Sequence, residues 1–143
     1  YSMKQTQIQK IALDSCLVID LIEKPGVASG LKARLRGKSI TVVLCDVVLQ
    51  EVTRVRGLSP QVIIEKISKI LGRKIELEEI DEQNKTAAEQ ITNQFQTCHN
   101  GDNKILSLCQ AKDFVLVTFD KMLLKACSFV GVAAFHPLMA GGI

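Results

Sequence analysis

The sequence predicts an α/β protein, a three-layer α/β/α sandwich around a central parallel sheet of four or five strands. Short apolar runs rich in β-branched residues alternate with segments of helical periodicity along the 143 residues. Strands that are separated by helices pair in parallel, and a parallel sheet needs helices on both of its faces. Right-handed crossovers between the strands then complete the three layers.

The first two predicted strands are separated by helical sequence. Residues 9–14 form the first strand, and a helix over 15–24 ends at the Pro-Gly pair that follows. Residues 27–37 are a short helix or a loop, because glycine interrupts them. Residues 39–45 form the second strand.

The middle of the chain is mostly helical. Residues 46–57 form a helix with Asp46 as its N-cap. Residues 59–72 form another, with a serine cap, a proline at the first helical position and a glycine at the end. Residues 74–80 alternate and form a short third strand, and residues 81–98 form a long polar helix.

The last part begins with a break at the letters HNG. A helix opened by Asp102 follows, then a fourth strand over 114–117 and a helix opened by Asp120. Residues 131–135 form the fifth strand.

The composition is that of one folded domain. With 47% hydrophobic and 23% charged residues, the chain is suited to a sizeable core. We expect the domain to span residues 4–143 and interpret residues 1–3 as an expression remnant. No run reaches the ~18 apolar residues that a membrane helix needs, and no signal peptide is expected. The five cysteines include no C-x-x-C pair, so we expect reduced thiols, a cytoplasmic protein and no structural zinc.

Four acidic residues are expected at one edge of the sheet. Asp14 ends the first strand, and Asp120 follows the fourth. Glu51 lies in the helix after the second strand, and Asp102 opens the helix before the fourth. Ligands of parallel sheets bind beyond the carboxyl ends of the strands. Clustered carboxylates repel one another unless a cation neutralises them, and oxygen ligands suit Mg²⁺ or Mn²⁺.

Each acid also has a structural interpretation when it is taken alone. Asp14, Asp102 and Asp120 are suited to capping helices, and Glu51 to an ion pair with Arg54 one turn further on. The order and spacing of all four acids therefore support the metal site, rather than any one of them.

Basic residues are concentrated between the first two strands. Lys32, Arg34 and Arg36, together with Arg54, are candidates for binding an RNA backbone, although such residues also occur on any solvated surface. His136, which precedes a proline, is interpreted as structural.

The segments around the acids resemble the four acidic motifs of the PIN-domain family, in order. They read IALDSCLVIDLIE, VVLCDVVLQEV, GDNKILSLCQAK and VLVTFDK. The resemblance runs from about residue 9 to residue 137. It implies a PIN-like α/β/α fold and Mg²⁺- or Mn²⁺-dependent cleavage of single-stranded RNA. Many small members are VapC-like toxins, which implies an antitoxin partner, and a homodimer is expected as well.

The resemblance also implies roles for single residues. Asp14, Glu51, Asp102 and Asp120 match its metal-binding acids, and Ser15 and Thr118 match hydroxyls that support these acids.

Two positions depart from the family pattern. The family often has Asp-Thr-Asn where this chain has Cys16 as the third residue, and Thr-Asn-Asp where this chain has Phe119. The missing amides affect the support of the site but remove no carboxylate.

Three other functions share parts of this pattern. A phosphatase of the haloacid dehalogenase class needs a second acid two residues after Asp14, where this chain has Cys16. A phospho-acceptor receiver domain distributes its acids differently. A non-catalytic PIN-like module for RNA binding or assembly remains the main alternative, and it would depend more on the basic stretch than on the acids.

Overall fold

The computed structural model describes residues 9–80, 86 and 100–139, with the backbone alone for residues 100–102. Its centre is a five-stranded sheet in the order β3-β2-β1-β4-β5, in which every pair of neighbours is parallel. This confirms the predicted fold class. The strands are β1 (Gln9–Leu13), β2 (Ile40–Cys45), β3 (Ile75–Glu78), β4 (Val115–Val117) and β5 (Ala134–Phe135).

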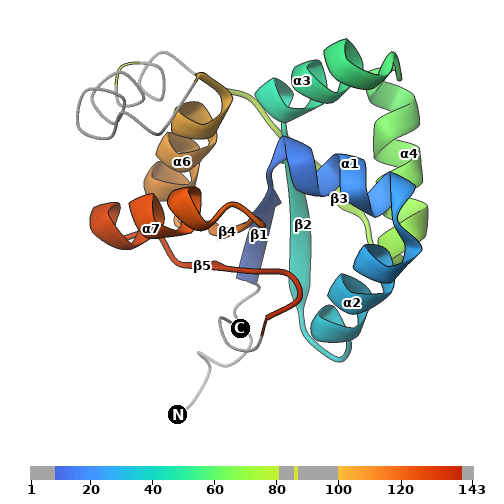
Figure 1. The fold of residues 1–143 in the computed structure, drawn as a ribbon, viewed down its shortest axis with the longest axis horizontal. Helices are drawn as coiled ribbons and strands as arrows, with labels where there is room; N and C mark the ends of the chain where they lie inside the picture. Colours follow the sequence, from blue (N-terminus) through green and yellow to red (C-terminus); the bar gives the residue numbers. More distant parts are fainter. Residues whose placement is uncertain (1–8, 81–85, 87–99, 140–143) are drawn as a thin grey trace.

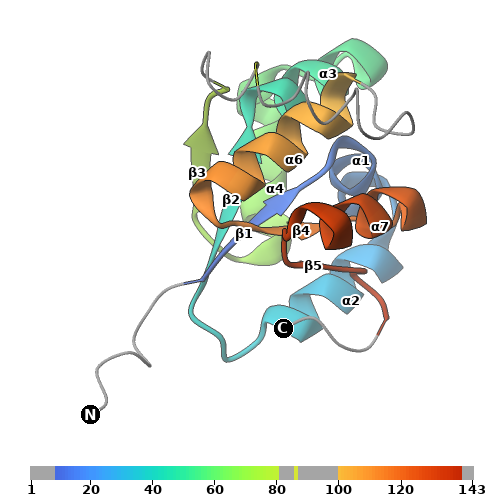
Figure 2. The same ribbon diagram turned by 90° about the vertical axis from the view of Figure 1, so that its left-hand side faces the viewer.

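Helices cover both faces of the sheet. The helices described are α1 (Ser15–Glu23), α2 (Pro25–Leu35), α3 (Asp46–Arg56), α4 (Pro60–Leu71), α6 (Asn100–Lys112) and α7 (Lys121–Val130). Helices α1, α2 and α4 pack together on one side, and α6 and α7 lie together on the other (Figures 1 and 2). Helix α3 contacts α1 and α4 as well as α6, so it lies across one end of the sheet. None of the helices described is long and apolar enough to cross a membrane.

The strand order reverses direction between β1 and β4. The chain passes from β1 to β2 and β3 on one side, and then returns to the other side for β4 and β5. Such a reversal leaves a crevice at the carboxyl ends of the two central strands, because the crossover helices leave on opposite faces. Residues 11–13 and 42–45 of the central strands are buried, as expected for a sheet covered on both faces.

The local signals for α4 agree with its observed bounds. The Ser59 hydroxyl accepts a hydrogen bond from the Val62 amide, and Pro60 occupies the first helical position. Gly72 ends the helix with φ +64°, a backbone conformation that glycine adopts without steric cost. The buried face repeats every four residues through Ile63, Ile67 and Leu71.

Three predictions about helix ends need correction. The segment read as a short helix or loop is α2, which Pro25 begins rather than only ending α1. Asp46 is the first residue of α3 and not its N-cap, which is Cys45. Helix α6 begins at Asn100, so Asp102 lies inside its first turn and the expected HNG break extends too far. Helix ends depend on contacts that local sequence does not contain.

The predicted helix over residues 81–98 falls outside the described part of the chain, apart from Thr86, which is helical.

Candidate functional site

Asp14 and Thr118 meet at the reversal point of the sheet. Asp14 follows β1, Thr118 follows β4, and the Asp14 amide donates to the Val117 carbonyl at 3.5 Å. The side chain of Asp14 is 6% exposed. Its Oδ1 accepts a hydrogen bond from the Leu17 amide at 2.9 Å, which caps α1, and its Oδ2 accepts one from the Thr118 hydroxyl. Both oxygens are therefore held in fixed directions.

Thr118 connects Asp14 to Asp120. The Thr118 side chain is fully buried, and its hydroxyl also accepts a hydrogen bond from the Asp120 amide at 3.1 Å. One hydroxyl thus ties a buried carboxylate to the turn that carries an exposed one. Ser15, the other hydroxyl expected to support the acids, is the first residue of α1 and is partly exposed.

Asp120 caps α7. Its Oδ1 accepts hydrogen bonds from the Met122 amide at 2.9 Å and the Leu123 amide at 3.2 Å. The carboxylate is exposed at the carboxyl end of β4. The interpretation of Asp14 and Asp120 as caps is therefore confirmed, and capping is compatible with a second role because each cap uses one oxygen.

Glu51 is held by Arg54. Two guanidinium nitrogens of Arg54 donate to the Glu51 carboxylate, with Nη2–Oε1 at 2.8 Å and Nε–Oε2 at 3.2 Å. The pair is half-exposed on the surface of α3. A metal ion at Glu51 would have to compete with Arg54 for the carboxylate.

Asp102 is placed only by its helix. It is the third residue of α6, and its side chain lies outside the described set. Helices α3 and α6 contact each other, which brings the helices that carry Glu51 and Asp102 together across the end of the sheet.

A divalent metal is implied by these acids, and the described residues fit it in part. Asp14 and Asp120 present carboxylate oxygens at adjacent strand ends, and carboxylate oxygens are the donors that Mg²⁺ and Mn²⁺ prefer. Among the described side chains, which exclude Asp102, no group of three or more acids, histidines or cysteines is arranged around one point. The donor chemistry therefore fits a hard cation, while Glu51 points to Arg54.

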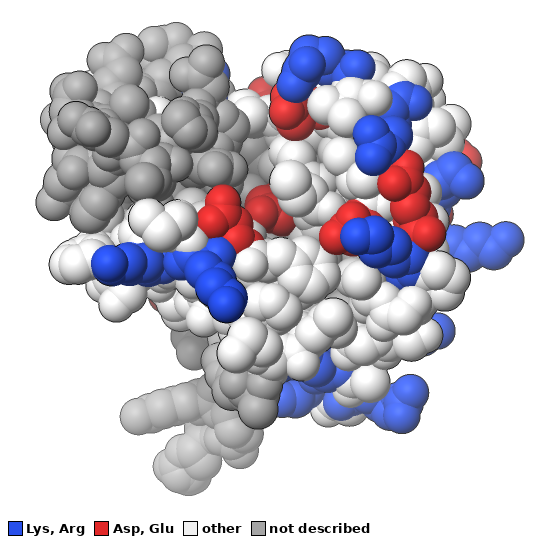
Figure 3. Space-filling view, viewed as in Figure 1, with Lys and Arg blue, Asp and Glu red and all other residues white. Residues whose placement is uncertain are grey.

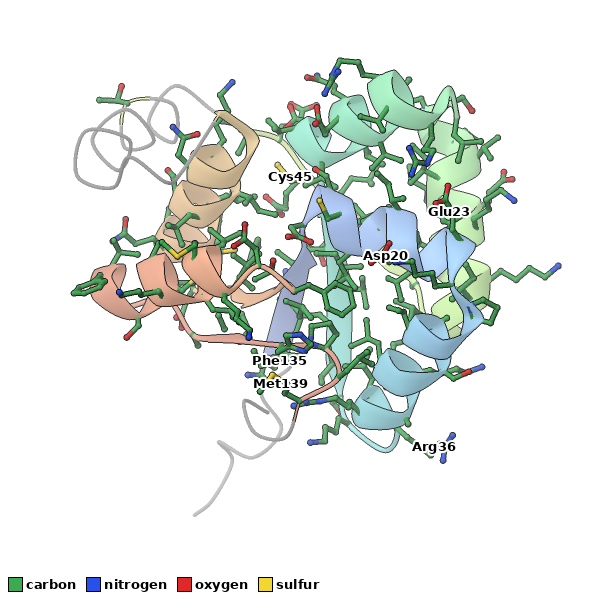
Figure 4. All side chains as sticks on the ribbon, viewed as in Figure 1. Asp20, Glu23, Arg36, Cys45, Phe135 and Met139 are labelled. Atoms are coloured by element: carbon green, nitrogen blue, oxygen red, sulfur yellow. The ribbon has the colours of Figure 1, made fainter. Side chains whose placement is uncertain are left out.

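Of the predicted RNA-binding residues, Arg54 lies beside the acid Glu51, whereas Lys32 and Arg36 lie away from the acids. Residues 36–39 lead into the amino end of β2, whereas Asp14 follows the carboxyl end of β1. Five residues of strand separate the two ends, which is roughly 16 Å. Figure 4 shows Arg36 at the opposite end of the molecule from Cys45, the last residue of β2. Lys32 lies near Gly72, close to the amino end of β3.

Charges around the acids are mixed. Figure 3 shows acidic side chains between α7 and α1, with Lys and Arg side chains on both sides of them. Two further ion pairs lie on this part of the surface, between Arg56 and Glu23 at 2.6 Å and between Lys24 and Asp20 at 3.4 Å. The guanidinium of Arg56 lowers the pKa of Glu23.

Buried polar residues of α6 were missed by sequence reasoning. Asn103 is 5% exposed and Ser107 is 1% exposed. The two residues are four apart on the helix face that is otherwise apolar, and this spacing was the signal that could have identified them.

Comparisons with known proteins agree with the observed fold. The family model for the PIN domain matches residues 11–128. The fold is similar to that of VapBC2 from Rickettsia felis, solved bound to a promoter DNA fragment, with 17% identity and a TM-score of 0.68 over 90% of this chain and 98% of that one. It is also similar to VapBC-1 from nontypeable Haemophilus influenzae (14%, TM-score 0.67, 92% and 100%) and to the PIN domain endonuclease Utp24 (16%, TM-score 0.58, 93% and 86%).

A comparison with curated protein sequences gives no significant match. At such low identity the solved structures establish the fold alone, and the family model, which spans most of the chain, establishes the family. With the acids at the reversal point of a five-stranded parallel sheet, this chain belongs to the PIN domain family.

Proposed function

We propose that the chain is a Mg²⁺- or Mn²⁺-dependent ribonuclease that cleaves single-stranded RNA at the carboxyl edge of its sheet. PIN domains are generally nucleases. The observation that carries the proposal is the hydroxyl of Thr118, which donates to buried Asp14 and accepts from the amide of Asp120. This bridge fixes the Asp14 carboxylate to the backbone of the turn that carries Asp120, at neighbouring strand ends where a ligand of a parallel sheet binds.

The proposed metal ligands are Asp14, Glu51, Asp102 and Asp120. When bound, a divalent ion supplies positive charge at the scissile phosphate and makes an attacking water more acidic. The protein contributes orientation. The Leu17 amide and the Thr118 hydroxyl fix the two oxygens of Asp14, so this carboxylate needs little rearrangement to receive a cation.

The ion pair of Glu51 and Arg54 gives Arg54 a role in this proposal. If Glu51 held a metal ion, the guanidinium of Arg54 would be released as a forked donor, which matches the geometry of a phosphate. We therefore keep Arg54 as a candidate for the RNA backbone near the acids. Lys32 and Arg36 are kept for a more distant part of the RNA, because they lie at the amino end of the sheet.

We also propose that the chain acts as the cytoplasmic toxin of a toxin–antitoxin pair and forms a homodimer. The support is its membership of the PIN family and its structural likeness to chains from VapBC complexes. The antitoxin would cover the acidic edge. Co-purification with a small protein encoded next to this chain supports the pairing, and purification of the chain alone from its native source counts against it.

The decisive experiment is cleavage of single-stranded RNA by the wild type and by Asp14→Asn and Asp102→Asn, each with Mn²⁺ and with EDTA. We expect Mn²⁺-dependent cleavage in the wild type and its loss in both variants, with circular dichroism unchanged. Glu65→Gln removes an exposed carboxylate from α4 and serves as the control. Full activity in Asp102→Asn would remove that residue from the site.

The alternative is a non-catalytic module that binds RNA or assembles with other proteins. Its support is that Asp14 and Asp120 cap helices and that Glu51 forms an ion pair with Arg54. A folded wild type that binds several RNAs equally well in Mn²⁺ and in EDTA, and cleaves none of them, would favour this alternative.

A further inference from the structure

The segment after α7 contacts α2 and also the turn over residues 118–120, which carries Asp120. We call residues 134–139 the C-terminal strap. We propose that this strap holds the Thr118–Phe119–Asp120 turn in place, and that Arg34 is a positioning residue that acts through the strap rather than an RNA contact. The inference rests on the proposed function in so far as the turn supports a metal site.

Arg34 fastens the strap to α2. Its Nη1 donates to the carbonyl of His136 at 3.1 Å and to the carbonyl of Met139. Its guanidinium carbon lies 4.6 Å from the centre of the Phe135 ring. Figure 4 shows Phe135 and Met139 close together at this place. The guanidinium of Arg34 already donates to two carbonyls and lies over an aromatic ring, so it is a poor candidate for binding a phosphate of RNA.

Helix α2 also leaves room for the strap at Gly30. A Cβ built at Gly30 would lie 2.4 Å from Cδ2 of Leu138. Leu138 therefore occupies the space that any other residue at position 30 would fill. The same leucine donates its amide to Nδ1 of His136 at 3.1 Å, which orients the imidazole ring.

Two contacts connect the strap to the turn. The ring of His136 lies edge-to-face against Phe119, with ring centres 5.0 Å apart and planes at 80°. The amide of Thr118 donates to the carbonyl of Phe135 at 3.3 Å. Phe119 is one of the two positions at which this chain departs from the family pattern, and here its aromatic ring is the contact surface for the strap.

The chain of contacts therefore runs from α2 to the acids. Arg34 holds His136, His136 packs on Phe119, and the residues on either side of Phe119 are Thr118 and Asp120. Because the Thr118 hydroxyl also bonds to Asp14, a shift of this turn would change the distance between the carboxylates of Asp14 and Asp120.

The test compares Arg34→Ala, Arg34→Lys and His136→Ala with Arg73→Ala as a matched control. Arg73 also donates to backbone carbonyls, those of Leu35, Lys38 and Ile40, but it lies away from the turn. Mn²⁺ affinity is measured by calorimetry, and kcat and KM are measured on a single-stranded RNA. Amide hydrogen exchange of residues 118–120 is measured in every variant.

We expect Arg34→Ala and His136→Ala to lower kcat by about tenfold, with weaker Mn²⁺ binding, little change in KM and faster exchange at residues 118–120. Arg34→Lys should recover part of the loss, since a lysine reaches one carbonyl. A double variant that combines Arg34→Ala with His136→Ala should have a kcat only slightly lower than the more severe single variant, because both changes release the same turn. Arg73→Ala should lower stability alone.

Two results overturn the inference. One is a raised KM in Arg34→Ala with kcat, Mn²⁺ affinity and exchange unchanged, which would make Arg34 an RNA contact. The other is unchanged exchange at residues 118–120 in His136→Ala, which keeps the test valid if Arg34→Ala fails to fold. If the wild type neither binds Mn²⁺ nor cleaves RNA, the proposed function fails, and the exchange measurement still decides whether the strap holds the turn.

Discussion

At the scale of single residues, the hydroxyl of Thr118 connects Asp14 to the backbone of Asp120. In Thr118→Val the shape is kept, but Asp14 loses its bond to Oδ2 and the Asp120 amide loses its acceptor. We expect the free energy of unfolding to fall by about 1–3 kcal/mol, because buried polar groups are left unpaired. Urea unfolding measures the loss. Thr118→Ser, which keeps the hydroxyl, should recover most of it, and equal losses in both variants would contradict the role of the hydroxyl.

The cysteines differ sharply in their surroundings. Cys16 is exposed, whereas Cys45, Cys109 and Cys127 are buried. Burial raises the pKa of Cys45 from 9.0 to about 12 and also raises that of Cys109. The folded state therefore keeps a proton on Cys45 that the unfolded chain releases, and this contribution to the free energy of unfolding falls as the pH rises from 9 to about 12.

Burial and a raised pKa should make Cys45 and Cys109 unreactive, because the thiolate is the nucleophile, whereas Cys16 is exposed to reagents. At pH 8 we expect iodoacetamide to modify Cys16 quickly, and to modify Cys45 and Cys109 only after urea unfolds the protein. Peptide mass mapping over time distinguishes the sites. Equal rates for Cys16 and Cys45 in the native protein would show that the region around β2 opens readily.

At the scale of elements, Asp46 joins α3 to the chain beyond β3. Its Oδ1 accepts hydrogen bonds from the amides of Val47 at 2.8 Å and Ile80 at 3.2 Å, and from the thiol of Cys45 at 3.4 Å. We expect Asp46→Ala to lower the free energy of unfolding by about 1–2 kcal/mol and to speed exchange at the Ile80 amide. Asp46→Asn keeps an acceptor oxygen, so its free energy of unfolding should be close to that of the wild type. A stable Ile80 amide in Asp46→Ala would exclude this link.

Helix α3 carries the ion pair between Arg54 and Glu51, which is a proposed metal ligand. Arg54→Ala should raise the affinity for Mn²⁺ in the absence of RNA by no more than a few-fold, because exposed ion pairs contribute about 0–1 kcal/mol. The same variant should bind RNA more weakly. Calorimetry with Mn²⁺ alone measures the first effect, and Glu51→Gln should weaken Mn²⁺ binding. A weaker Mn²⁺ affinity in Arg54→Ala would show that Arg54 supports the site instead.

At the scale of the whole molecule, metal binding should raise the thermal stability of the folded protein. A ligand that binds only the folded state at a hundred times its Kd adds about 2.7 kcal/mol, which for a domain of this size raises Tm by roughly 5–10 °C. We expect Mn²⁺ to raise Tm in the wild type but not in Asp14→Asn, as measured by calorimetry. An equal rise in both proteins would place the ion elsewhere.

The arrangement of the whole chain decides where the candidate RNA-binding residues lie relative to the acids. Lys32 and Arg36 are close in sequence to the acid-bearing first strand, but Lys32 lies near Gly72, close to the amino end of β3, and Arg36 lies at the opposite end of the molecule from Cys45. Arg34 lies against Phe135 and His136 instead. A crossover between parallel strands starts at the carboxyl end of one strand and returns to the amino end of the next. A residue in the crossover can therefore be close in sequence to the first strand and still lie at the other end of the sheet.

The sequence by itself determined the alternation of strands and helices, the caps Asp14, Ser59 and Asp120, and the family, because these depend on short-range periodicity and on motifs of fixed spacing. The role of Asp46 could not be read in this way, because it depends on Ile80, 34 residues further on. Only the tertiary structure decided that Arg34 meets His136, 102 residues further on, and that Thr118 meets Asp14, 104 residues earlier. Such pairs depend on strand order, which local sequence leaves open.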